Sequence, residues 1–225
     1  MDYQLKRNSR STKLSISLKS TGEVIVTAPK LIPKFFIDKF VRDNQTWINN
    51  QKQKIKNKFK FIDQDFVYIF GKKYSLKIES TIEPSKVSLK NNELTIQLHQ
   101  KNNQVITFNS QQPTSVLLRF LKNTTQHYIT KKTSLMAKKM GLTYKKISFK
   151  TQKTRWGSCS STKNLNFNLK LIHFSPEIID YVIIHELAHL EHMNHSKNFW
   201  QLVEQYDPDY RLHRGWLKRQ GSTID

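Results

Sequence analysis

Two histidines with a glutamate between them are the residues of this chain best suited to chemistry. In the segment His185-Glu-Leu-Ala-His189 the two imidazoles are four residues apart, and residues at that spacing project from one face of an α-helix. Two such imidazoles can bind one Zn²⁺ at about 2.0–2.1 Å each. Glu186 follows the first histidine, where its carboxylate can act as a general base. This HExxH pattern predicts a zinc-dependent hydrolase.

A third ligand is needed, and His192 and His195 both follow the pair. If the helix continued, His192 would share its face, but about 10 Å of helical rise would separate it from His185. Asn194 offers a helix end, since asparagine tolerates the left-handed C-terminal cap. The chain can then turn back and bring His195 to the metal. We therefore predict zinc bound by His185, His189 and His195, with His192 or a distant carboxylate as the alternatives.

The residues around the motif predict a buried helix. Ser175 is suited to the N-cap, Pro176 to the first turn, and Glu177 to the positive end of the helix dipole. The following residues are apolar around much of the helix, which is typical of a core helix. Polar groups inside such a helix need a partner, and metal binding supplies one. A second helix is expected to begin at Ser196 and to end at Asp207.

Alternation of apolar and polar side chains predicts a half-buried strand over residues 164–172. A strand directly before an HExxH helix can pair with an extended peptide by β-augmentation. We therefore predict Trp156, Gly157 and Asn166 as substrate-binding residues. The alternative for the asparagines is the solvated face of an ordinary core strand.

Further motifs surround the histidines and carry a family resemblance. Between Arg155 and Trp200 the chain reads RWGSCSS, YVIIHELAHL and NHSKNFW, and its opening contains RNSRSTKLSISLKSTGEVIVTAP. Together these segments resemble the YgjP-like zinc metallopeptidase family, relatives of the SprT-like proteases, nearly end to end. The resemblance implies a zincin-like α+β fold and peptidase activity. It also implies that the same three histidines hold zinc and that Glu186 is the base.

Composition gives expectations about the compartment of the protein. Cys159 is the single cysteine among 225 residues, so no disulfide can form within them, which suits a reducing cytosol. A structural role for this thiol is favoured over a regulatory one. There is no apolar signal region in residues 1–20 and no apolar run of 18 residues. We therefore expect a cytoplasmic protein without a membrane segment.

The positive charge is concentrated in the first two thirds of the chain. There are 38 Lys and Arg against 17 Asp and Glu, and residues 151–225 hold only nine of the former and eight of the latter. Residues 1–150 therefore hold 29 basic and 9 acidic residues, a net +20. This excess predicts DNA contact through the N-terminal 150 residues. The alternative is a lysine-rich composition reflecting an AT-rich genome, since only eight of the 38 are arginine.

The order of predicted elements favours an α+β fold over a doubly wound one. We divide the chain into a β-rich portion with one helix at 1–110 and a zincin-like metallopeptidase portion at 111–225, unless both form one unit. Gly141 is expected to end the long helix. The predicted elements are a hairpin of strands 14–18 and 24–26, a helix at 33–57, strands at 66–70, 74–78, 86–90 and 94–98, a helix at 114–140 and strands at 146–150 and 164–172.

The resulting hypothesis is a zinc metallopeptidase in which a zinc-bound water is activated by Glu186. Arg155, Tyr210 and His213 are candidates for stabilising the oxyanion, although His213 and Arg214 also suit a solvated helix face. One alternative is a zinc-dependent nucleotide phosphoanhydride hydrolase, a pyrophosphatase. Another is a nucleic-acid-associated protein with a structural zinc, which would normally require four protein ligands.

Overall fold

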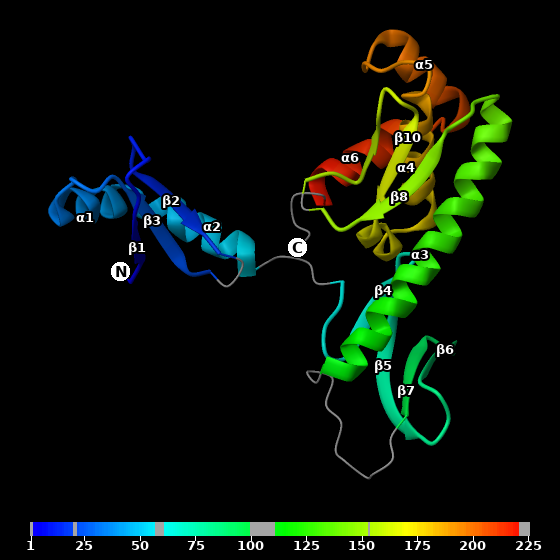
Figure 1. The fold of residues 1–225 in the computed structure, drawn as a ribbon, viewed down its shortest axis with the longest axis horizontal. Helices are drawn as coiled ribbons and strands as arrows, with labels where there is room; N and C mark the ends of the chain where they lie inside the picture. The colour runs from blue at the N-terminus through cyan, green and yellow to red at the C-terminus, as the bar shows by residue number, and fades with distance from the viewer. Residues whose placement is uncertain (1, 20–21, 57–60, 100–110, 153, 221–225) are drawn as a thin grey trace. The chain divides into compact units, whose positions relative to one another are not determined.

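The computed structural model describes residues 2–19, 22–56, 61–99, 111–152 and 154–220 (Figure 1). The chain divides into two units, the first covering Met1–Phe59 and the second Lys60–Arg219. The first unit is a three-stranded sheet of order β1-β3-β2 with two helices, in which β2 runs antiparallel and β1 parallel to β3. Its elements are β1 (Gln4–Arg7), β2 (Ser15–Leu18), β3 (Val24–Ala28), α1 (Lys34–Asp43) and α2 (Gln45–Lys56).

The core of the first unit lies between the sheet and the helices, where Val24 and Val26 of β3 pack with Ile37 of α1 and Ile48 of α2. The predicted hairpin is confirmed as β2 and β3. The single helix predicted over 33–57 is wrong, because Asn44 divides it. The Asn44 side-chain amide donates to the carbonyl of Phe40 at 2.8 Å, and its backbone leaves the helical region at φ −101° and ψ 14°.

The second unit begins with a four-stranded sheet of order β4-β5-β7-β6, in agreement with the four predicted strands. One face packs on the long helix α3, through Leu94, Ile96 and Leu98 of β7 and Leu117 and Leu121 of α3. The opposite face is polar. The elements of this part of the second unit are β4 (Phe66–Ile69), β5 (Lys72–Thr81), β6 (Lys86–Lys90), β7 (Glu93–His99) and α3 (Gln111–Met140).

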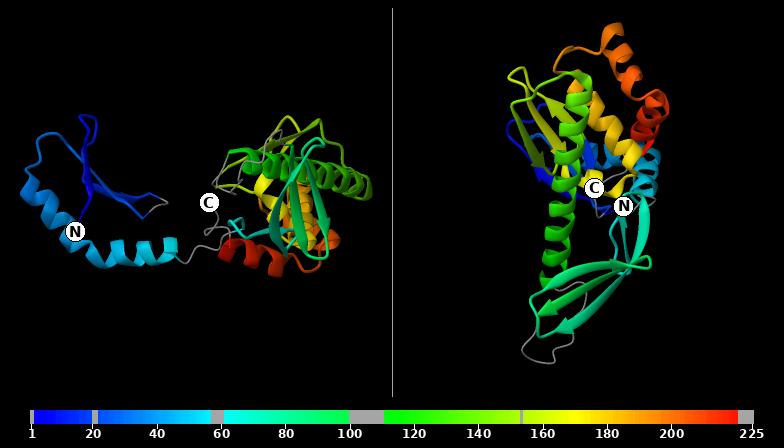
Figure 2. Two further views of the ribbon diagram at one scale, coloured as in Figure 1. Left: turned by 90° about the horizontal axis from the view of Figure 1, so that it is seen from below. Right: turned by 90° about the vertical axis from the view of Figure 1, so that its right-hand side faces the viewer.

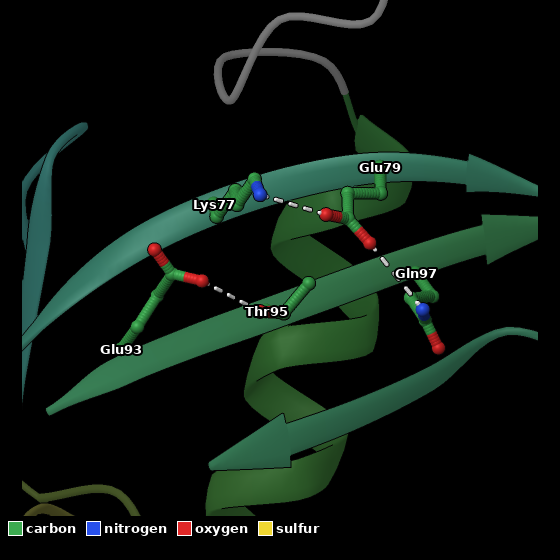
Figure 3. Close-up of polar contacts among 5 residues, drawn as sticks. All are labelled: Lys77, Glu79, Glu93, Thr95 and Gln97. Atoms are coloured by element: carbon green, nitrogen blue, oxygen red, sulfur yellow. Dashed lines mark hydrogen bonds and ion pairs between the residues drawn. The ribbon is translucent and has the colours of Figure 1, made fainter. Parts of the chain in front are cut away.

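Figure 3 shows the polar face of this sheet with α3 behind it. Lys77 lies 3.0 Å from the Glu79 carboxylate, Gln97 donates to the same carboxylate at 3.4 Å, and Thr95 donates to Glu93 at 3.2 Å. The contact between Gln97 and Glu79 joins the adjacent strands β7 and β5, and the other two contacts join residues of the same strand. The face is therefore an ordinary solvated one.

The part of the second unit that follows α3 contains a three-stranded sheet of order β8-β10-β9, with β8 parallel and β9 antiparallel to β10. The 3₁₀ helix η1 and three α-helices complete it (Figure 1). The architecture is α+β, as predicted. The elements that follow α3 are β8 (Lys146–Lys150), β9 (Gly157–Cys159), β10 (Asn164–Asn168), η1 (Leu169–His173), α4 (Pro176–Ala188), α5 (Lys197–Tyr206) and α6 (Tyr210–Gln220).

The strand predicted over 164–172 is too long, because Asn168 ends it. The buried Asn168 side chain accepts from the backbone N–H of Lys170 at 3.1 Å and donates to the carbonyls of Gln152 and Arg155 at 2.8 and 2.9 Å. It thereby caps η1 and ties it to the loop before β9.

Among the described helices, none has the length and apolarity needed to cross a bilayer.

Helix α3 joins the two sheets of the second unit (Figure 2). Tyr128 of α3 donates to Asp180 of α4 at 3.0 Å, and Lys132 lies 2.6 Å from the same carboxylate. The α3 helix ends at Gly141 as predicted, with a positive φ of 67°. Because the second unit runs from Lys60 to Arg219, with α3 packed against β6, β7, η1 and α4, the expected division at residue 110 falls inside it.

His173, at the end of η1, connects this region to β4. Its side chain is 8% exposed, its Nδ1–H donates to the Tyr68 carbonyl at 2.7 Å, and its ring stacks on Phe61 at 5.2 Å. Burial lowers the pKa of His173 to about 4. The imidazole is therefore neutral in the folded protein at neutral pH.

The stability of the protein should consequently fall as the pH falls from 6.5 to 4. In that range the unfolded chain protonates His173 whereas the folded chain does not. The contribution of this histidine to the free energy of unfolding is therefore complete above pH 6.5. It declines by at most about 3 kcal/mol towards pH 4. Urea unfolding of wild type and His173→Gln over this range would measure the difference, since glutamine keeps an N–H donor. The same pH dependence in both proteins would contradict the assignment.

Candidate metal centre

Helix α4 carries the first two histidines and ends sooner than predicted. It stops at Ala188, with His189 as its C-cap, rather than at Asn194. A tight turn follows, in which the backbone N–H of His192 donates to the Ala188 carbonyl at 2.9 Å. The chain then reverses before α5, whose N-cap Ser196 accepts from the Phe199 N–H at 3.4 Å. This early reversal places the following histidine beside the first two.

His185, His189 and His195 form a cluster whose potential ligand atoms all lie within 4.8 Å of one another. The Nε2 atoms of His185 and His195 are 3.1 Å apart. Two nitrogens bound to one tetrahedral zinc would be separated by about 3.3 Å. Burial lowers the pKa of His185 to about 3, with His189 as the next cause, so the unprotonated imidazole needed for metal binding is favoured. The three side chains therefore fit a zinc ion.

His189 is oriented by His192, the residue that the sequence offered as an alternative ligand. Its Nδ1–H donates to the backbone carbonyl of His192 at 3.0 Å, which leaves Nε2 free to bind metal. The His192 ring lies outside the cluster, and its Nε2 is 4.0 Å from the Glu191 carboxylate. His192 thus supports the site through its main chain.

Trp200 of α5 supports His195. The indole stacks on the His195 ring at 5.5 Å and 25° and on the Tyr210 ring at 5.3 Å and 17°. His195 is exposed, so this aromatic contact restricts an otherwise mobile ring. Spacing alone gave no signal for this role of Trp200.

Replacing Trp200 with alanine should weaken zinc binding by about 10- to 100-fold, as is usual when the support of a ligand is removed. Zinc titration against a chromophoric chelator would measure the affinity. Trp200→Phe should restore most of it, because phenylalanine keeps a stacking surface. Equal zinc affinity in wild type and Trp200→Ala would contradict this role.

Glu186 lies in the core next to the histidines. Its side chain is 5% exposed, and its Oε2 is buried without a hydrogen-bond partner among the described residues. Burial raises the pKa of Glu186 to about 8, and the charge of Arg155 opposes that shift. A buried carboxylate lacking a partner is costly, which is typical of a functional group.

Gly157 of β9 lies directly against Glu186. A Cβ atom built at Gly157 would be 2.5 Å from the Glu186 Oε1, so a side chain cannot be placed there without displacing the carboxylate. The main chain of β9 therefore passes immediately over the proposed base. The sequence-based prediction placed Gly157 at the substrate, and the structure places it at Glu186.

The other two predicted substrate-binding residues lie differently. The Trp156 ring packs on Phe174 at 4.7 Å. Asn166 lies in β10 and its amide points to Ser158 of β9 at 3.4 Å. Because β10 has a strand on each side, the expectation that the strand before the helix would pair with a peptide is wrong. Periodicity could not distinguish a central strand from an edge strand.

Strand β9 is the open edge nearest Glu186. The hydrogen bonds from Asn168 N–H to the Trp156 carbonyl and from Ser160 N–H to the Asn164 carbonyl, both 2.9 Å, fix the alternation of the antiparallel ladder. The backbone groups of Gly157 and Cys159 therefore point away from β10. In the described part of the chain, β9 pairs with β10 alone.

The side chain of Cys159 is half-buried. Burial raises the pKa of the Cys159 thiol to about 11, and the charge of Glu186 adds to that shift. The thiol therefore remains protonated at neutral pH, where it is a poor nucleophile and a poor metal ligand.

The candidates for oxyanion stabilisation occupy three positions around the site. Arg155 is exposed near Glu186, and Tyr210 is buried against Trp200. His213 is half-buried, with its Nδ1–H donating to Asp207 at 2.8 Å, rather than lying on a solvated face.

Tyr181 was not predicted to lie at the metal centre, although it precedes His185 by one helical turn. Its ring lies 5.8 Å from the His185 ring, and burial raises the pKa of Tyr181 to about 12. The spacing of four residues from a ligand could have identified it.

Comparison with known proteins gives one family match. The family model described as YgjP-like, metallopeptidase domain, matches residues 12–220. Among curated proteins no match is found. Two solved metallopeptidase zymogens are similar over part of the chain. Abylysin of Pyrococcus abyssi is 18% identical, covering 43% of this chain and 99% of its own, with a TM-score of 0.38. Jannalysin of Methanocaldococcus jannaschii is 24% identical, covering 39% and 94%, with a TM-score of 0.35.

Proposed function

Because the chain belongs to the YgjP-like metallopeptidase family, we propose that it is a zinc metallopeptidase that cleaves extended polypeptides. The observation that carries the proposal is the convergence of His185, His189 and His195 next to the buried carboxylate of Glu186. The three histidines would hold the zinc ion, because their possible ligand nitrogens lie within 4.8 Å of one another.

The chemistry divides between the metal and the chain. A zinc ion held by three imidazoles supplies a Lewis acid that polarises a carbonyl and lowers the pKa of water towards about 7. Glu186 accepts the proton that the attacking water loses and delivers it to the leaving nitrogen. Its burial supports this role, because a carboxylate of raised pKa both takes up and releases a proton near neutrality.

The open edge of β9 supports an extended peptide as the substrate. Backbone N–H and carbonyl groups of Gly157 and Cys159 point outwards and can pair with a substrate strand by β-augmentation. Gly157 also lies against Glu186. A peptide paired at this edge would therefore run past the base.

Two other functions can be separated from this proposal. A structural zinc normally has four protein ligands, whereas the cluster in the described part of the chain has three. A phosphoanhydride hydrolase would use the same metal and base on a nucleotide. Distinguishing this function from a peptidase therefore requires a direct comparison of the two classes of substrate.

The test incubates the zinc-loaded protein with a panel of denatured proteins and, separately, with nucleoside triphosphates. Each reaction is run with and without single-stranded DNA, because the net +20 of residues 1–150 makes DNA a proposed partner. New peptide amino termini without phosphate or pyrophosphate release would support the proposal. Release of phosphate or pyrophosphate without peptide cleavage would overturn it.

A further inference from the structure

Arg214 of α6 is held beside the metal centre by the residue that supports the third ligand. Its guanidinium carbon lies 4.4 Å from the centre of the Trp200 ring, and the same indole stacks on His195. Arg214 and His195 are thus both in contact with Trp200. The positive charge of Arg214 also contributes to lowering the pKa of both His185 and His195, which is consistent with this proximity.

No acidic group neutralises this arginine within the described ranges of the chain. The nearby carboxylates have other partners: Asp207 accepts from His213 at 2.8 Å, and Glu204 lies 3.8 Å from Arg211. Arg155, on the Glu186 side of the site, likewise has no carboxylate within ion-pairing distance among the described residues. Two unpaired cations therefore flank the centre, although residues 151–225 as a whole carry a net charge of only +1.

Arg214 is exposed, and its guanidinium makes no hydrogen bond to another residue in the described part of the chain. A guanidinium lying flat on an indole makes a cation–π contact through its face, while its N–H donors project from its edge. Those donors match a carboxylate in a bidentate geometry. Because Trp200 already orders the side chain, less conformational entropy is lost when an anion binds.

We propose that Arg214 is a specificity-determining residue that binds a carboxylate of the peptide substrate close to the scissile bond. This inference rests on the proposed peptidase function and adds to it a substrate class, peptides with a carboxylate near the cleavage point. Two sources could supply the group, the side chain of Asp or Glu and the free C-terminus of the peptide.

The test uses one cleavable peptide in matched versions. Asp is exchanged for Asn at each position flanking the cleavage point, and the C-terminus is a free acid or an amide, so the two sources are distinguished. In wild type, the version with the recognised carboxylate should have a kcat/KM about 10- to 100-fold higher than its neutral counterpart, mainly through KM. In Arg214→Gln this ratio should fall to about one, and in Arg214→Lys to an intermediate value.

Arg211→Gln is the matched control, since Arg211 is an exposed arginine of the same helix, and it should keep the wild-type ratio. Binding of the same peptides to zinc-loaded Glu186→Gln, with and without Arg214→Gln, gives a second measurement that does not depend on turnover. A ratio unchanged by Arg214→Gln, or equal losses on acidic and neutral peptides, would overturn this proposal alone. Failure of wild type to cleave any peptide would instead overturn the proposed function, and this inference with it.

Discussion

Replacing Glu186 with glutamine is expected to lower peptidase turnover by about 10²- to 10⁴-fold, the usual contribution of a general base. Glutamine has nearly the same shape and fills the same buried position beneath Gly157, but its amide cannot accept the proton from the attacking water. The three histidines are unchanged, so zinc should remain bound. Steady-state cleavage of a denatured protein, together with the zinc content of the purified variant, would measure both effects.

The conservative variant Glu186→Asp separates the proton-transfer role from packing. It retains a carboxylate but shortens it, so partial activity is expected, above that of Glu186→Gln. Turnover by Glu186→Gln equal to that of wild type, with the same zinc content, would show that another group acts as the base.

The variant His195→Ala should lose zinc, whereas His192→Ala should retain it. Removing one of three ligand side chains leaves two imidazoles, and we expect a loss of affinity greater than the about 100-fold typical of mutations to supporting residues. His192 contributes its backbone carbonyl to His189, and alanine keeps that carbonyl. Competition with a chromophoric chelator would measure the zinc affinity of both variants and wild type.

The paired variants control for each other, because the two histidines lie three residues apart in the same reversal of the chain. Both variants should keep the far-ultraviolet circular dichroism of wild type. Loss of zinc in His192→Ala with retention in His195→Ala would show that the ring of His192, rather than that of His195, completes the site.

The grouping of the three histidines was predictable from sequence, but the structural reason for it differs from the one predicted. Helical rise argued against His192 on the assumption that α4 continued to Asn194. In the structure α4 ends at Ala188, and His192 lies in the following turn. The grouping of the three histidines agrees with the prediction because either ending allows the chain to turn back before Ser196.

Contacts between residues distant in the chain could not be predicted from the local sequence patterns. Alternation of Leu165 and Phe167 identified β10, but pairing with both β8 and β9 depends on residues distant in the chain. The end of β10 at Asn168 follows from hydrogen bonds to Gln152 and Arg155, which local periodicity does not contain. The positions of Trp200 and Arg214 likewise follow from how α5 and α6 pack.

The shortness of β9 has a consequence for the lifetime of an enzyme–substrate complex. Three residues, Gly157–Cys159, span only about 10 Å, and two of them present backbone groups outwards. A docked chain thus gains few main-chain hydrogen bonds, each with a net contribution of about 1 kcal/mol. Residence should be brief unless side chains add to it, which would let the enzyme sample many segments of an unfolded polypeptide and release those without a suitable anchor.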